Sequence, residues 1–114
     1  MLIEQGELIE VNCLLPDDKF RNHPVVVLSN SDINEYEGAC ICAMISGITT
    51  NDAYSFWLDE SMLTKPAKKK CQVRCQLIML VPENQIIQRI SKVKKHYLKQ
   101  IIDKIISTTF NIDE

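Results

Sequence analysis

The feature that most limits the fold of this chain is the order of its elements. Short runs of strand length fill the first 90 residues, and one amphipathic segment follows them. The runs are residues 7–13, 24–28, 39–45, 54–58, 71–81 and 86–90. Runs such as 24–28 and 39–45 are apolar at consecutive positions, which is typical of strands buried on both faces. Strands so close in sequence pair mainly antiparallel, so we expect a compact, closed or strongly curled sheet.

The connections between these runs differ in length and charge. Residues 14–23 show no hydrophobic period and contain the sequence PDDK, which predicts a loop longer than the usual median of about five residues. Residues 31–38 could form a turn of helix followed by a loop. Residues 64–70, TKPAKKK, form a basic loop. Long loops on rigid scaffolds often carry function, so the loop at residues 14–23 is a candidate for a site.

The C-terminal segment has the clearest helical pattern in the chain. Its apolar residues recur at spacings of three and four: Tyr97, Leu98, Ile101, Ile102, Ile105 and Ile106. Ser91 suits an N-cap, so we expect a helix from there to about Thr109. Lys92, Lys94 and Lys95 would then oppose the helix dipole at about 0.3–1 kcal/mol each. The apolar stripe is expected to pack on its own sheet and only secondarily against a second subunit.

Length and composition favour one small intracellular domain. The 114 residues predict a single domain, 1–114, whose core needs neither disulfides nor metal for stability. No apolar run reaches the roughly 18 residues that span a bilayer, so no membrane association is expected. The acidic start lacks the basic and apolar regions of a secretory signal. The five cysteines are therefore expected to be reduced thiols in the cytoplasm.

The net charge of −2 hides an uneven distribution along the chain. Residues 1–60 carry eleven acidic side chains and only two basic ones, Lys19 and Arg21, whereas residues 61–114 carry eleven basic and four acidic side chains. Opposed halves can form a surface that holds an anion on one side. They can equally attract each other within one fold, and charge alone does not separate these interpretations.

Cysteine spacing argues against a metal centre. Cys40 and Cys42 would share one strand face, and so would Cys71 and Cys75, because side chains alternate along a strand. Neither pair has the C-x2-C spacing of a zinc knuckle. Buried thiols are therefore favoured, and no metal or other cofactor is expected. A Cys-rich metal or redox protein remains an alternative.

A second candidate chemistry is the cleavage of RNA through its own 2′-hydroxyl, which requires no metal. Such an enzyme supplies a base, an acid and positive charge for the crowded phosphate. His23, Arg21, Arg74 and Ser46 suit these roles. Each also has an ordinary structural interpretation: a histidine before proline is typical of a turn, a strand arginine usually pairs with a carboxylate, and a serine often ends a strand.

The order of several short motifs adds a resemblance that covers nearly the whole chain. The motifs are GELIEV at 6–11, HPVVVLSN at 23–30, CAMISG at 42–47, VRCQ at 73–76 and the terminal amphipathic helix. Their order and spacing resemble the MazF/PemK (Kid/CcdB-like) toxin family. The resemblance implies an SH3-like β-barrel of five to seven short antiparallel strands with a C-terminal amphipathic helix, usually as a homodimer. It also implies a metal-independent endoribonuclease that an antitoxin inhibits and that leaves a 2′,3′-cyclic phosphate and a 5′-hydroxyl.

Residue by residue, the match with the family's motifs is incomplete. The family's arginine before proline falls on His23, and its strand-end threonine falls on Ser46, which keeps the hydroxyl. Val73, Arg74 and Cys75 match the PemK/Kid branch, but the branch's aspartate is replaced by Gln76. The Q-x-R that follows in the family is replaced by the apolar residues 77–79. Because an amide cannot exchange a proton at ordinary pH, Gln76 cannot act as an acid or base.

The resemblance therefore predicts a toxin with an altered site. Its catalytic residues would be His23 as acid or base, since the unperturbed pKa of histidine is near 6.5, Arg74 as phosphorane stabiliser and Ser46 as hydrogen-bond donor. Its RNA-binding residues would be Arg21, Gln76, Lys65, Lys68 and Lys69, although the lysine loop could also simply remain solvated. The expected partners are single-stranded RNA, a cognate antitoxin and a second copy of the chain. The alternative is a catalytically degenerate barrel that binds RNA or protein.

Overall fold

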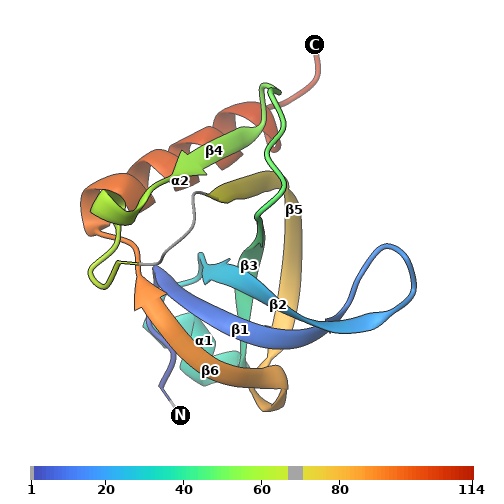
Figure 1. Cartoon of the computed structure of the whole chain (residues 1–114), viewed down its shortest axis with the longest axis vertical. Coiled ribbons are helices and arrows are strands. Elements are labelled where there is room, and N and C mark those ends of the chain that lie inside the picture. Colours follow the sequence, from blue (N-terminus) through green and yellow to red (C-terminus); the bar gives the residue numbers. More distant parts are fainter. Residues whose placement is uncertain (1, 67–70) are drawn as a thin grey trace.

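The computed structural model describes residues 2–66 and 71–114 and shows a mainly antiparallel β-fold with two α-helices (Figure 1). The strands are β1 (Glu7–Leu14), β2 (Phe20–Val27), β3 (Ala39–Ser46), β4 (Ser55–Leu58), β5 (Cys71–Pro82) and β6 (Ile86–Lys92). The helices are α1 (Ser31–Glu37) and α2 (Lys95–Thr108), with short 3-10 turns at Glu60–Met62 and Glu83–Gln85. The prediction of a mainly β domain with a C-terminal amphipathic helix is confirmed.

The six strands form one strongly curled sheet in the order β4-β5-β3-β2-β1-β6. No ladder joins the edge strands β4 and β6 within the described residues, so the sheet is not a closed barrel. Residues beyond β4 nevertheless reach the end of β6. Leu63 and Val93 form an isolated β-bridge. The N–H of Thr64 donates to the carbonyl of Lys92, and the N–H of Lys94 donates to the carbonyl of Met62, both at 2.8 Å.

Alternation of side chains gives the curled sheet a hydrophobic cluster on each face. Leu8, Val26 and Ala43 belong to a cluster that packs against α2, whereas their neighbours Val25 and Cys42 belong to a second cluster. Adjacent residues of one strand point to opposite faces, which explains why these strands are apolar at consecutive positions. α2 contributes its buried residues Leu98, Ile101 and Ile105 to the first cluster, as the apolar stripe predicts.

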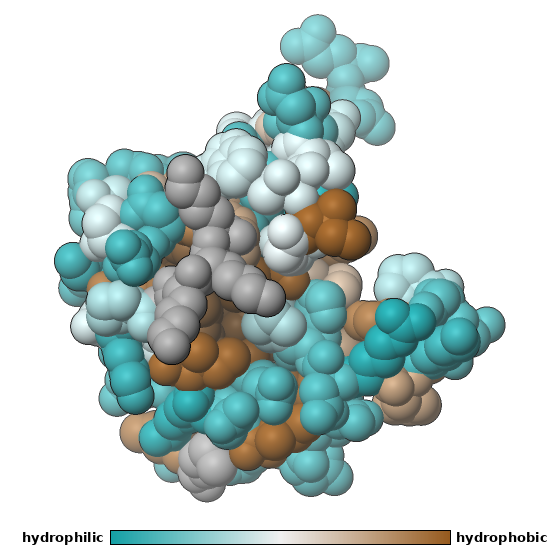
Figure 2. Space-filling model, in the orientation of Figure 1, coloured by the Kyte–Doolittle hydropathy of each residue, from teal (hydrophilic) through white to brown (hydrophobic). Residues whose placement is uncertain are grey.

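The β1–β2 hairpin is longer than the sequence predicts. β2 begins at Phe20, and its residues 20–23 pair with residues 11–14 of β1, so the predicted loop 14–23 is wrong at its C-terminal end. Residues 20–22 are exposed, which removes the hydrophobic alternation that would reveal a strand. The connection shrinks to residues 15–19 and includes Asp18 at a φ of 64°. The hairpin projects from the body of the molecule and is largely hydrophilic on the face seen in Figure 2.

The start of α2 also differs from the prediction. The helix begins at Lys95 after the N-cap Lys94, which provides no side-chain cap. Ser91 is not a cap but lies in β6, where its hydroxyl bonds to the main chain of Lys65 at 2.7 and 3.1 Å. Lys92 also lies in β6 and pairs with Glu4 at 2.7 Å. Only one of the three predicted lysines therefore lies in the first helical turn.

Neither helix of the described residues is long and apolar enough to cross a membrane.

The packing of α2 makes a prediction about stability. Ile101 has no exposed surface, whereas 57% of Ile106 on the same helix is exposed. Ile101→Ala should lower the free energy of unfolding by about 2–5 kcal/mol, because it removes buried methyl groups and leaves a cavity. The matched control Ile106→Ala should change it by no more than about 0.5 kcal/mol. Urea unfolding measures both values, and equal losses in the two variants would contradict this packing.

Candidate functional site

Three of the residues singled out in the sequence lie on one face of the sheet, at the same end of neighbouring strands. Val25 of β2 pairs with Met44 of β3, and Met44 pairs in turn with Arg74 of β5. Directly paired residues share a face, and so do residues two apart on a strand. His23 is two residues from Val25, and Ser46 is two residues from Met44. The imidazole, the hydroxyl and the guanidinium are thus carried by adjacent strands on a common face.

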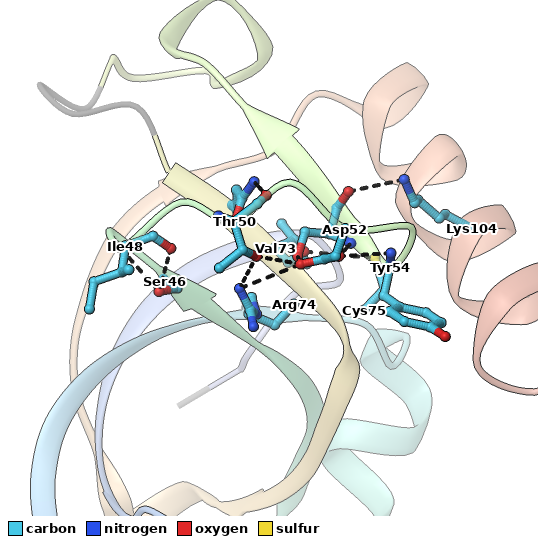
Figure 3. Close-up of polar contacts among 11 residues, drawn as sticks. Ser46, Ile48, Thr50, Asp52, Tyr54, Val73, Arg74, Cys75 and Lys104 are labelled. Atoms are coloured by element: carbon cyan, nitrogen blue, oxygen red, sulfur yellow. Dashed lines mark hydrogen bonds and ion pairs between the residues drawn. The ribbon is translucent and has the colours of Figure 1, made fainter.

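Arg74 is held by the loop between β3 and β4. Its Nη1 donates to Oγ1 of Thr50 at 2.8 Å and lies 4.0 Å from Oδ2 of Asp52 (Figure 3). The arginine side chain is only 20% exposed. No other hydrogen bond or ion pair joins its guanidinium to the described residues, so its remaining N–H groups are available to a ligand.

Asp52 organises this loop. Its carboxylate accepts hydrogen bonds from the hydroxyl of Thr50, from the N–H of Tyr54 at 2.8 Å and from both the N–H and the hydroxyl of Ser55. These hydrogen bonds hold the pKa of Asp52 well below its usual range, and the bond from Thr50 has the largest effect. The carboxylate is therefore ionised, and it fixes the hydroxyl that contacts Arg74.

Gln72 ties the same loop to the sheet. The side chain has no exposed surface, and its amide accepts from the N–H of Thr50 at 2.9 Å and donates to the carbonyl of Thr50 at 2.7 Å. The side chain thus continues the hydrogen bonding of the sheet at the point where β3 ends. Gln72 and Arg74 lie on the same face of β5, so one strand both anchors the loop and presents the cation that the loop orients.

The sequence motifs gave no indication that Thr50, Asp52 or Gln72 belongs to the site. A signal was present in β5, where polar residues occupy every second position at 72, 74 and 76 between the buried Val73 and Cys75. Such a row indicates a strand face that meets polar partners instead of the core. The identity of those partners depends on a contact across 22 residues of sequence, which no local pattern reveals.

Ser46 uses its hydroxyl within the loop between β3 and β4. Its hydroxyl donates to the carbonyl of Ile48 at 3.0 Å and accepts from the N–H of Ile48 at 3.2 Å, closing the turn that begins the loop. Figure 3 shows this pair to one side of Thr50. The hydroxyl proton is therefore used within the turn, and the hydroxyl that contacts Arg74 belongs to Thr50.

Two side chains of the site contain a buried polar atom that no described residue pairs. They are Nε2 of His23 and Oε1 of Gln76. Most buried polar atoms in proteins are hydrogen-bonded, and one left unpaired costs about 1–3 kcal/mol. Both atoms would therefore gain from a ligand that supplied the missing partner.

The remaining predicted RNA-binding residues are more dispersed. Arg21 is exposed on the projecting hairpin, on the strand face of His23, and forms an ion pair with Asp17. Lys65 lies beside Ser91 of β6, and no hydrogen bond or ion pair joins it to His23 or Arg74 within the described part of the chain. Lys68 and Lys69 lie outside the described residues.

The cysteine thiols belong to the interior. Cys13, Cys40, Cys42 and Cys75 are buried, Cys71 is half-buried, and all five are free. Burial raises the pKa of Cys75 to about 11, and the hydrogen bond with Cys40 raises the pKa of Cys42. Within residues 2–66 and 71–114, no group of three or more His, Cys, Asp or Glu side chains could hold a metal ion.

Helix α2 supports the site from the opposite face of the sheet. Nζ of Lys104 donates to the carbonyl of Ser55 at 3.0 Å, and Oγ1 of Thr109 donates to the carbonyl of Cys75 at 2.9 Å. These bonds fasten β4 and β5 to the helix next to the loop that holds Arg74. The C-terminal helix therefore stabilises the strands that carry the site as well as the core.

Comparison with solved structures shows close similarity in fold at low sequence identity. MazF from Deinococcus radiodurans superposes with a TM-score of 0.77 and 13% identity, covering 94% of this chain and 96% of that one. An endoribonuclease from a mycobacterial species, in complex with its cognate antitoxin, superposes with a TM-score of 0.77 and 10% identity, covering 98% of both chains. The Mycobacterium tuberculosis toxin MazF-mt6 superposes with a TM-score of 0.70 and 13% identity, covering 93% of this chain and 99% of that one.

Comparison at the level of sequence gives a family but no individual relative. No curated protein sequence gives a significant match to the chain. A model of the family described as PemK-like, MazF-like toxin of type II toxin-antitoxin system matches residues 4–108, which include all six strands and α2. The chain therefore belongs to the family of PemK-like, MazF-like toxins of type II toxin-antitoxin systems.

Proposed function

We propose that the protein is an endoribonuclease toxin that cleaves single-stranded RNA through the 2′-hydroxyl of the substrate, without a metal ion. The observation that carries the proposal is the arrangement on one sheet face of a half-buried, loop-held Arg74 and of His23, whose buried Nε2 is not hydrogen-bonded to any described residue. Membership of the toxin family and the endoribonuclease among the structural neighbours support it.

His23 is the proton carrier of the proposed reaction. Neutral imidazole takes the proton of the 2′-hydroxyl as that oxygen attacks the adjacent phosphorus. The resulting imidazolium returns the proton to the departing 5′-oxygen, so the products are a 2′,3′-cyclic phosphate and a 5′-hydroxyl. Gln76 cannot replace His23 in either proton transfer, because an amide does not titrate at ordinary pH.

Arg74 stabilises the charge that develops on the phosphorane. Its guanidinium keeps N–H groups that no described residue pairs, and two of them can bind two phosphate oxygens at once. Thr50 and Asp52 hold the side chain before the substrate arrives, so that little reorganisation accompanies the reaction. Ser46 acts indirectly by closing the first turn of this loop, and Arg21 and the lysines of residues 65–70 add attraction for the RNA backbone.

A cognate antitoxin and a second copy of the chain are the proposed protein partners. Several structural neighbours are complexes of MazF with MazE, and one is an endoribonuclease with its cognate antitoxin. Exposed apolar side chains suited to such contacts include Leu14, Phe20, Leu77 and Leu80. We place the active form in the cytoplasm as a dimer of single domains, 1–114.

Incubation of the purified protein with a mixed-sequence RNA in EDTA should yield discrete fragments with cyclic phosphate ends. Arg74→Ala should lower the rate by about 100-fold or more, because it removes the preorganised donors of the phosphorane. Lys99→Ala, which breaks only an exposed ion pair with Asp103 on α2, should keep the wild-type rate.

Two results of this assay would count against the proposal. Cutting that requires an added metal ion would exclude the mechanism. Salt-dependent RNA binding without any product would favour the alternative, a catalytically degenerate barrel that serves as an RNA- or protein-binding module.

The two histidines of the chain provide a matched test of the proton carrier. His23→Gln should slow cleavage by about 100-fold or more, because glutamine keeps hydrogen bonding but cannot transfer a proton. His96→Gln changes an exposed residue of α2 whose ring bonds to Gln100, and it should leave the rate unchanged. Single-turnover cleavage of a defined RNA measures both, and an unimpaired His23→Gln would show that another group moves the proton.

A further inference from the structure

Two thiols near the start of β3 lie in contact with each other. Sγ of Cys40 is 3.4 Å from Sγ of Cys42, because the two residues are two apart on the strand and project to the same face. Both belong to the hydrophobic cluster on the face of the sheet opposite to α2. No hydrogen bond joins the sulfurs of any other two cysteines in the described part of the chain, so this pair differs from the other three thiols.

The two sulfurs differ in their access from outside. Although only 1% of its surface is exposed, Cys40 lines a pocket of about 220 Å³ between the N-terminal residues 2–3, α1 and the turn that begins at Glu83. Cys42 has no exposed surface and does not line this pocket. A pocket of this size admits only a small molecule, and that molecule meets Cys40 first. The pair therefore has an outer thiol and an inner thiol.

The outer thiol is also the one that ionises more readily. The hydrogen bond with Cys42 lowers the pKa of Cys40, and this effect outweighs burial and the nearby carboxylates of Glu7 and Glu83, which raise it. The same hydrogen bond raises the pKa of Cys42. Because the thiolate is the nucleophilic form of cysteine, Cys40 is suited to attack an electrophile while Cys42 keeps its proton.

We infer that Cys40 and Cys42 form a dithiol site that reacts with a small hydroperoxide and closes to a disulfide. The site lies on the same face of β3 as Ser46 but at the other end of the strand, and it does not depend on the proposed ribonuclease function. A metal ion suits the pair less well, because no third His, Cys, Asp or Glu side chain of the described residues completes a metal site with it.

The reaction proceeds in two steps. The thiolate of Cys40 attacks the outer oxygen of the hydroperoxide and the O–O bond breaks, so Cys40 becomes a sulfenic acid and the leaving oxygen takes up a proton and departs as an alcohol or water. Sγ of Cys42 then attacks Sγ of Cys40, the S–O bond breaks, and hydroxide leaves as water with the proton of Cys42. The two thiols together lose two electrons and two protons, and the hydroperoxide takes up both.

Closure requires a small movement of β3. A disulfide brings its two sulfurs to about 2.05 Å and usually spans about 4.4–6.8 Å between Cα atoms. Residues two apart in an extended strand are about 6.6 Å apart, near the upper end of that range. A slight contraction of the strand between Cys40 and Cys42 therefore allows the bond to form.

The test treats the reduced protein with hydrogen peroxide in the presence of a chelator. The protein is then denatured, alkylated with iodoacetamide and digested with trypsin for mass spectrometry. Trypsin releases both thiols in one peptide that begins at Asn22 and contains no other cysteine. This peptide should lose two hydrogen atoms in mass and resist alkylation, and dithiothreitol added before alkylation should reverse both changes.

Single-thiol variants separate the roles of the two cysteines. In Cys42→Ala, Cys40 should gain oxygen instead of forming a disulfide, because the nucleophile remains and its partner is gone. In Cys40→Ala, the inner thiol should stay unmodified. The matched control Cys75→Ala removes another thiol without exposed surface and should leave the disulfide unchanged. Circular dichroism spectra that match the wild type would show that each variant is folded.

The wild-type protein alone can overturn the inference, even if a variant fails to fold. Retention of both free thiols in the peptide from Asn22, while the half-buried Cys71 is oxidised, would show that the pair is closed to peroxide. Stable addition of oxygen at Cys40, or a disulfide between Cys42 and Cys13, would show that the two neighbours do not combine. Cleavage of RNA, or its absence, changes none of these outcomes.

Discussion

Two hydrogen bonds between the side-chain amide of Gln72 and the main chain of Thr50 hold the candidate site together. Gln72 has no exposed surface, so an unpaired amide there would cost about 1–3 kcal/mol and the loop is strongly favoured to stay in place. With Thr50 fixed, its hydroxyl meets both Arg74 and Asp52. One buried amide thus determines where the guanidinium of the site lies.

The same strand links the site to the core. Val73 and Cys75 of β5 have no exposed surface and pack in the cluster beneath α2, whereas Gln72 and Arg74 point to the opposite face and bond to the loop. Burial on one face stabilises the strand and leaves the other face free to carry polar groups. A bulge at Gln76 interrupts this alternation next to Arg74, and Oε1 of Gln76 is buried there without a hydrogen bond to any described residue.

Much of the fold could be predicted because burial leaves a local pattern. The strands at 39–45 and 71–81 and the stripe of α2 were visible in the sequence, but the exposed residues 20–22 concealed half of β2. Ser91 was mistaken for a cap because its partner, Lys65, lies in a distant segment. The site follows the same rule: the strand that carries Arg74 was predictable, whereas His23 was assigned to a loop, and the contacts that hold Arg74 join residues far apart in sequence.

The low identity to solved relatives, 10–13% for the three compared, shows that this fold tolerates extensive change in sequence. The proposed function requires that RNA binds the face that carries His23 and Arg74. NMR titration of ¹⁵N-labelled protein with an uncleavable 2′-O-methyl RNA measures where the RNA binds. Binding to this face predicts the largest amide shifts around His23, Thr50 and Arg74. Shifts confined to the lysine-rich start of α2, with this face unchanged, would contradict it.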